Sequence, residues 1–191
     1  MSHNRALDLH VLDLLPHNLN KLVILDVGCG FGDWGFLIRT RKRGVPYLIG
    51  ADIWLPYLKI LKPLNIYDEV IRIEASRIPI KSKSVDITLA CEILEHLPKK
   101  NGEILLKNIE RITKKLIVLS TPLNCPQDEL EGNPYQKHVT EWSLKELKNF
   151  GFQGRIVYTL PKTLRIIDRI RRLSLGLRPQ PCLIVAKKRL G

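Results

Sequence analysis

Hydrophobic residues occur along the chain as short continuous runs, and polar segments with helical spacing separate them. Such runs cover 21–27, 45–52, 69–75, 84–91 and 114–121, and two further runs cover 154–160 and 182–188. Runs of strand length with few polar interruptions are typical of strands that are buried on both faces of a parallel sheet. The pattern therefore predicts seven strands, the first five of them in a parallel sheet.

The segments between the runs have the spacing of amphipathic helices. Helices are predicted over 5–15, 33–43, 55–64, 98–113 and 143–152. Strand and helix then alternate through five units, which predicts an α/β fold with helices on both faces of the sheet. We find no internal repeat and no linker long enough to divide the chain, so we expect a single domain over residues 1–191.

One segment interrupts this alternation between the last two strands. The sequence "PKTLRIIDRIRRLSLGL" at 161–177 begins with proline, which is common in the first turn of a helix. Its isoleucines and leucines project onto one narrow face, and arginines lie beside that face. We interpret it as a basic amphipathic helix packed on the protein. The alternatives are a surface that docks on anionic lipid, RNA or a partner protein, and a lid over the binding pocket.

Composition excludes several classes of protein. No run is long and apolar enough to cross a bilayer, and residues 1–20 lack the pattern of a signal peptide. The four cysteines are scattered without a CxxC pair, so we expect neither a disulfide framework nor a metal site. A cytoplasmic location follows as the expectation, with peripheral attachment to a membrane as the alternative.

The net charge of +12 is high for this length. It suggests an anionic partner such as RNA, a membrane surface or a phosphorylated substrate. Because the charge is dispersed along the chain, a solvated basic surface explains it equally well.

The stretch "LVILDVGCGFGDW" at 22–34 carries the main chemical signal. Three glycines at alternate positions, Gly28, Gly30 and Gly32, follow a strand that ends near Asp26. A dinucleotide fingerprint would need the third glycine at position 33, where the chain has Asp33, and no phosphate-binding GK[ST] follows. The loop is thus predicted to hold a nucleoside without a pyrophosphate, and a nicotinamide-dependent oxidoreductase is the weaker alternative.

Four stretches in the same order resemble a known family. They are "LDVGCGFG" at 25–32, "IGADI" at 49–53, "IEASRIPIKSKSVDITLACEILEHL" at 73–97 and "HVTEWSLKELKNFGF" at 138–152. The chain resembles the class I S-adenosylmethionine-dependent methyltransferases, in particular those with a type 11 methyltransferase domain. The resemblance implies a Rossmann-like, mostly parallel seven-stranded sheet with an antiparallel last strand. It also implies S-adenosylmethionine as cofactor and methyl transfer as the activity.

The resemblance also implies cofactor-binding roles for residues that follow the first four strands. They are Asp26, Gly28, Cys29, Gly30 and Gly32, then Asp52, Ile53 and Trp54, then Glu74 and Ala75, and finally Cys91 and Glu92.

Different parts of the cofactor fall to different members of this set. In the family, the acid at Asp26 orients the glycine loop and lies near the methionine amino group, often through water. The acid at Asp52 accepts hydrogen bonds from the ribose hydroxyls. Trp54 would pack on the adenine or serve as a core aromatic residue. We interpret Cys29 and Cys91 as small packing residues rather than nucleophiles.

Two histidines are the candidate catalytic residues. If the methyl acceptor is a hydroxyl, its proton must be removed, and His96 and His138 are placed to do so near the carboxyl ends of the strands. A purely structural role is the alternative for each. The "NPY" at 133–135 follows the fifth predicted strand rather than the fourth, so it does not indicate a base N-methyltransferase.

The acceptor itself is not encoded in a motif. We expect a small or lipid-like molecule with a hydroxyl group, because no RNA-binding module is recognisable. The alternative is a methyltransferase, or a non-catalytic methyltransferase-like module, that acts on or binds RNA or a protein.

Overall fold

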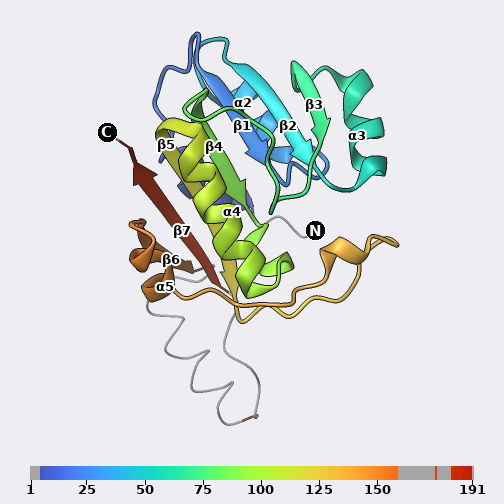
Figure 1. The fold of residues 1–191 in the computed structure, drawn as a ribbon, viewed down its shortest axis with the longest axis vertical. Helices are drawn as coiled ribbons and strands as arrows, with labels where there is room; N and C mark the ends of the chain where they lie inside the picture. Colours follow the sequence, from blue (N-terminus) through green and yellow to red (C-terminus); the bar gives the residue numbers. More distant parts are fainter. Residues whose placement is uncertain (1–4, 159–174, 176–181, 191) are drawn as a thin grey trace.

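The computed structural model describes residues 5–158, 175 and 182–190 (Figure 1). The predicted helix at 161–177 lies, except for Leu175, outside the described residues, so its role stays a prediction. The helices are α1 Arg5–Leu12, α2 Asp33–Arg41, α3 Leu55–Leu61, α4 Lys99–Ile112 and α5 Leu144–Asn149, with the short 3₁₀ helices η1 Lys62–Leu64, η2 Leu94–His96 and η3 Pro134–Gln136. The strands are β1 Val23–Val27, β2 Tyr47–Asp52, β3 Glu69–Arg72, β4 Val85–Cys91, β5 Thr113–Leu123, β6 Gln153–Tyr158 and β7 Cys182–Arg189.

All seven strands form one sheet in the order β3-β2-β1-β4-β5-β7-β6. Strands β1 to β5 are parallel, and β7 is antiparallel to both of its neighbours, β5 and β6. This confirms the predicted Rossmann-like fold class, including the antiparallel last strand. The strand order reverses between β1 and β4, and ligands of such sheets bind beyond the carboxyl ends of the strands at that point.

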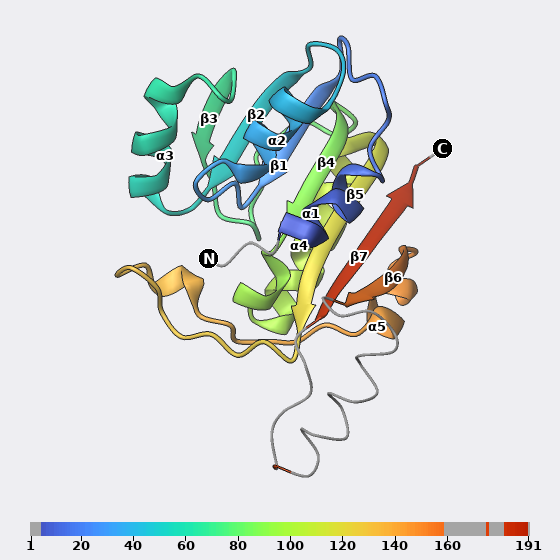
Figure 2. The same ribbon diagram turned by 180° about the vertical axis from the view of Figure 1, so that it is seen from behind.

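Helices cover both faces of the sheet. Helix α4 lies on the face seen in Figure 1, and α1 and α2 lie on the face seen from behind in Figure 2. Alternate residues of β1 show the two layers, since Leu25 packs into the cluster with α4 and Ile24 into the cluster with α1 and α2. Every residue of β4 is buried, as expected for a central parallel strand.

Several boundaries differ from the prediction by up to three residues, and two of them show the local cause or consequence. The first helix ends at Leu12 rather than at residue 15, although Leu15 is still buried. The third strand ends at Arg72 rather than at residue 75, because a turn closed by the Arg77 N–H to Glu74 carbonyl hydrogen bond follows. The turn leaves Glu74 and Ala75 in a loop beyond the sheet. Among the described residues, no helix combines the length and the apolarity that a bilayer span requires.

The segment between β5 and α5 crosses the carboxyl ends of the strands. In Figure 1 it runs from the end of β5 past the ends of β4 and β1 to η3, and then back to α5. This segment therefore lies at the side of the molecule at which the fold places a ligand.

Candidate cofactor and acceptor site

A cavity of about 210 Å³ lies at the carboxyl ends of the strands. Most of its lining comes from the loops after β1, β2, β3 and β4, and the segment around η3 supplies the opposite wall. Of the predicted cofactor residues, those on the lining are Gly28, Gly30, Asp52, Ile53, Glu74, Ala75 and Glu92. The fold thus brings together residues that are up to 64 positions apart in the sequence, counted from Gly28 to Glu92.

Asp52 joins the ends of the first two strands. Its Oδ2 accepts a hydrogen bond from the Gly30 N–H at 2.9 Å, and its Oδ1 accepts one from the Trp54 N–H at 2.8 Å. Burial raises the pKa of this carboxyl group, and the backbone N–H donors oppose the rise. Because a carboxylate oxygen has more than one lone pair, both oxygens can still accept a hydrogen bond from a ligand.

The glycines of the loop differ in what surrounds them. Gly30 has a φ of +52°, and a Cβ at this position would meet no atom within 4 Å. Gly32 has a φ of +88°, and its Cβ would meet Leu61 Cδ2 at 2.5 Å. Only Gly30 therefore keeps open space beside the backbone at the cavity, whereas Gly32 allows α2 to begin close to α3.

Asp26 lies below the loop and is not part of the lining. Its Oδ2 accepts a hydrogen bond from the Tyr67 hydroxyl at 2.5 Å. The Tyr67 hydroxyl oxygen in turn accepts one from the Gly35 N–H at 3.2 Å. Burial raises the pKa of Asp26 to about 7, against the effect of the Tyr67 hydrogen bond. Its other oxygen, Oδ1, is buried and has no hydrogen-bond partner among the described protein groups.

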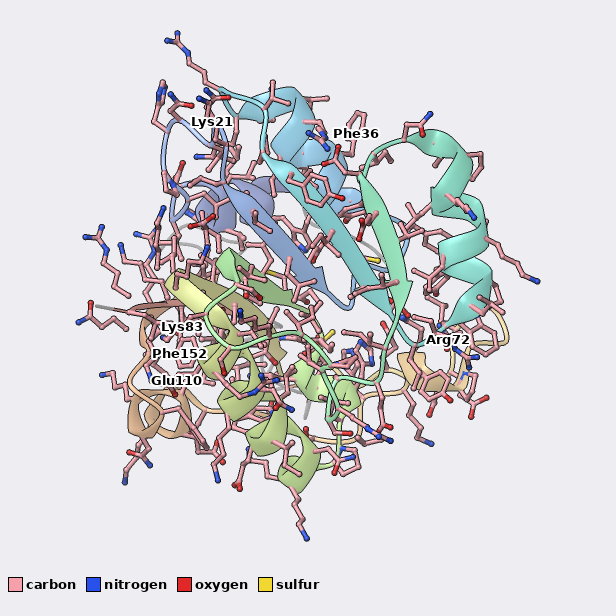
Figure 3. All side chains as sticks on the ribbon, turned by 45° about the horizontal axis from the view of Figure 1, so that its top comes forward. Lys21, Phe36, Arg72, Lys83, Glu110 and Phe152 are labelled. Carbon is pink, nitrogen blue, oxygen red and sulfur yellow. The ribbon has the colours of Figure 1, made fainter. Side chains whose placement is uncertain are left out.

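The predicted site residues Cys29, Gly32, Trp54 and Cys91 also lie outside the lining. Both thiols are buried, and burial raises the pKa of each well above its ordinary value. The Trp54 ring is edge-on to the Tyr135 ring, with their centroids 6.0 Å apart. In Figure 3, Arg72 marks the end of β3, and its Nε donates to the Ile53 carbonyl beside this part of the site.

A strained turn follows β4. Glu92 has a φ of +53°, a conformation that is uncommon for residues other than glycine. Its Oε1 accepts a hydrogen bond from the Ser120 hydroxyl at 2.6 Å. The turn leads into η2, where Glu95 is buried and accepts a hydrogen bond from Thr121 at Oε2. Burial, with a contribution from the nearby Glu92, raises the pKa of Glu95.

The two predicted catalytic histidines lie side by side. The centroids of the His96 and His138 rings are 4.8 Å apart. His96 Nδ1 bonds to the Lys137 carbonyl at 3.2 Å, and His138 Nδ1 bonds to the Cys125 carbonyl at 2.5 Å. A carbonyl can only accept, so each Nδ1 carries a proton. Burial and His138 lower the pKa of His96 to about 4, and burial lowers the pKa of His138.

Hydrogen bonds from the segment after β5 explain why these histidines meet. The backbone N–H groups of Val139 and Thr140 both donate to the Glu95 carbonyl. The Thr140 hydroxyl bonds to the carbonyls of Leu94 and Leu97, at 3.2 and 2.9 Å. The segment is thereby fixed to η2, and His138 is placed against His96.

The two histidines face different spaces. His96 lines the cavity beside Glu92, whereas His138 lines a second hollow of about 460 Å³. Cys125, Val139 and Glu141 are among the residues that line this second hollow. The pair therefore stands between a space beside the glycine loop and a hollow lined by the segment after β5.

Sequence reasoning did not identify three polar residues of the cavity lining. Asn101 on α4, and Asn133 and Gln136 of the opposite wall, line the cavity but belong to no motif of the resemblance. Asn133 is buried, and its side chain accepts a hydrogen bond from the Tyr135 N–H at the start of η3. The Asn-Pro pair, which marks a turn, is the signal that could have located this wall.

Comparison with known proteins identifies the class of the domain. Residues 25–118 match the family model of a methyltransferase domain. These residues include the end of β1, all of β2 to β4, the first half of β5 and the glycine loop with Asp52. This match confirms the predicted resemblance of this part of the chain to a methyltransferase domain.

Solved structures agree with this fold. An S-adenosylmethionine-dependent methyltransferase from Mesorhizobium loti is 18% identical with a TM-score of 0.62, and the alignment covers 94% of this chain and 96% of that one. One from Archaeoglobus fulgidus is 20% identical with a TM-score of 0.63, covering 96% and 94%. The [4+2]-cyclase SpnF is also similar, at 15% identity and a TM-score of 0.65, covering 98% and 82%. No curated protein sequence matches the chain.

Proposed function

We propose that the protein is an S-adenosylmethionine-dependent methyltransferase that acts on a hydroxyl group of a small or lipid-like molecule. The observation that carries the proposal is the pairing of the Gly30 N–H with the Asp52 carboxylate at the edge of the cavity. This pairing joins an open stretch of backbone to a carboxylate that can accept hydrogen bonds from two vicinal hydroxyls. A ribose presents that pair of groups.

The residues present fit S-adenosylmethionine. The open space at Gly30 leaves room for the ligand against the backbone, and Asp52 would hold the ribose hydroxyls. Ile53 and Ala75 offer apolar surface, and the Glu74 carboxylate could accept from the adenine amino group. At about 210 Å³ the cavity is smaller than pockets for drug-sized ligands, roughly 300–1,000 Å³. Part of the cofactor would therefore extend beyond this cavity.

The bound cofactor would supply an electrophilic methyl group, so the protein has to orient the acceptor and exclude water. Glu92 and His96 lie at the end of the cavity near β4. We propose that an acceptor hydroxyl reaches this end and that His96 and His138 promote loss of its proton. The second hollow on the His138 side offers space for the rest of the acceptor.

Calorimetry with S-adenosylhomocysteine tests the cofactor part of the proposal. We expect saturable binding to the full chain and a loss of at least about tenfold in affinity for Asp52→Ala, since a hydrogen bond to a charged group contributes roughly 1.5–3 kcal/mol. Glu103→Gln, an exposed carboxylate on α4, is the matched control and should bind normally. A wild-type protein that does not bind the ligand would refute the assignment.

A labelled-methyl transfer screen over small molecules, lipids, RNA and proteins tests the acceptor. Transfer to a hydroxyl compound supports the proposal, and transfer to RNA or protein supports the alternative. A Haloferax volcanii methyltransferase of this fold has been solved in complex with the Trm112 activator. The screen should therefore be repeated with lysate proteins added as potential partners.

We further propose a cytoplasmic location, for which the four free cysteines are the support.

A further inference from the structure

Three side chains beside the cavity present metal-ligating atoms to one another. Glu95, His96 and His138 each offer one such atom, and these atoms all lie within 4.8 Å of one another. Glu95 Oε1 is 4.0 Å from His96 Nε2. The expectation of no metal site came from the spacing of the cysteines. No cysteine belongs to this group, so that spacing could not reveal it.

The hydrogen bonds of the two imidazoles prepare them for a metal. Because each Nδ1–H donates to a backbone carbonyl, the lone pair of each neutral ring lies on Nε2. Metal-ligating histidines almost always have their other nitrogen bonded in this way, to a carbonyl, a carboxylate or water. Both histidines of the pair show this arrangement.

The third ligand has an unused acceptor. Glu95 Oε1 is buried and, in the described part of the chain, has no hydrogen-bond partner, whereas Oε2 is held by Thr121. A buried carboxylate oxygen without a partner is costly, and a bound cation would compensate that cost. The oxygen lies on the His96 side of its carboxylate.

We propose that Glu95, His96 and His138 bind a divalent transition-metal cation of the zinc type. Two imidazoles and one carboxylate are a known ligand set for zinc with an open fourth position. Zinc bonds of roughly 2.1 Å place tetrahedral ligands about 3.4 Å apart, so the three groups would move inward by about 1 Å. The three groups include no thiolate, the ligand that selects soft metal ions such as Cu(I).

The position of the cation suggests its use. His96 lines the cavity and His138 lines the second hollow, so the open coordination position would lie between the two spaces. A hydroxyl oxygen bound there would lose its proton to water more readily, because the cation stabilises the alkoxide. This use rests on the proposed function, and in it the two histidines would promote loss of the proton as ligands of the cation rather than as bases. Binding of the cation does not rest on that function.

Titration of metal-free, untagged protein with Zn²⁺, followed by competition with a chelating indicator, tests the site. We expect one equivalent to bind, and we expect affinity to fall at least about tenfold in His138→Ala and in Glu95→Gln. Co²⁺ in place of Zn²⁺ should give visible absorption bands that both variants lack. His17→Ala, an exposed histidine outside the site, is the matched control and should bind normally.

Two outcomes would overturn the proposal. One is the absence of saturable binding by a folded wild-type protein, and the other is binding that His17→Ala abolishes while His138→Ala retains it. Glu95→Gln keeps the shape of the side chain, so it remains informative if His138→Ala fails to fold. Binding of S-adenosylhomocysteine, measured in parallel without metal, shows separately whether the proposed function holds.

Discussion

The Asp52 carboxylate accepts a hydrogen bond from the Gly30 N–H at 2.9 Å, so the acid that ends β2 fixes the loop that follows β1. The same carboxylate holds the Trp54 N–H at the start of α3. One side chain therefore sets the spacing of two loops and also faces the cavity. Its role in ligand binding and its role in loop geometry can be separated by choice of substitution.

Asp52→Asn is the first such substitution. Asparagine keeps the size of the side chain but replaces one acceptor oxygen with a donor, so only one of the two backbone N–H groups keeps its partner. We expect a loss of about 1–2 kcal/mol in the free energy of unfolding and a weakening of S-adenosylhomocysteine binding by about tenfold or more. Urea unfolding and calorimetry measure the two effects. Unchanged affinity would show that Asp52 serves only the loops.

Alanine at Gly30 and alanine at Gly32 should have opposite consequences. At Gly30 the added methyl group has open space, so stability falls by only about 1 kcal/mol from the left-handed backbone, but the methyl group occupies the space proposed for the cofactor. At Gly32 the methyl group meets Leu61 and Tyr67, and the loss is about 2–4 kcal/mol.

Binding of S-adenosylhomocysteine to folded protein separates the two variants. Gly30→Ala should bind weakly and Gly32→Ala with near-normal affinity, each measured well below its melting temperature. The reverse order would place the ligand away from Gly30.

Asp26 should make stability depend on pH. Its pKa in the folded chain is about 7, against 3.8 ordinarily. As pH rises from about 4 to about 7, the unfolded chain releases this proton while the folded chain retains it, so wild-type protein loses up to about 4 kcal/mol over that range. Asp26→Asn has no such titrating group and does not share this loss. Its free energy of unfolding relative to that of the wild-type protein should therefore rise between about pH 5 and pH 8. Urea unfolding at both pH values measures the difference, and a constant difference would contradict the burial of the charge.

Much of the fold was predictable because its signals are local in the sequence. The buried run of β4 and the alternation of strands and helices predict the parallel sheet, and the acid at Asp52 is the last residue of its strand. The position of Asp26 was not accessible in this way. Its separation from the cavity depends on Tyr67, 41 residues later, whose hydroxyl binds it beneath the loop.

The acceptor side depends still more on distant contacts. Asn133 reaches the cavity only because the segment after β5 folds back over the strand ends, which no periodicity records. His96 and His138 could each be named from the sequence as candidates. Their contact could not, since it results from backbone hydrogen bonds between Glu95 and the residues after His138.

Thr140 tests whether that anchoring positions the histidines. Thr140→Val removes the hydroxyl that bonds to the Leu94 and Leu97 carbonyls but keeps the branched shape of the side chain. We expect the free energy of unfolding to fall by about 1–2 kcal/mol, because the two carbonyls lose the hydroxyl proton that they share. The larger consequence should be a looser segment around His138, and therefore weaker Zn²⁺ binding with unchanged S-adenosylhomocysteine binding, since Asp52 and Gly30 lie on other loops.

Ser143→Ala, which removes the capping box of α5 a few residues later, is the control for a general loss of about 1 kcal/mol. If both variants weaken Zn²⁺ binding equally, stability rather than the Thr140 anchor sets the geometry of the pair.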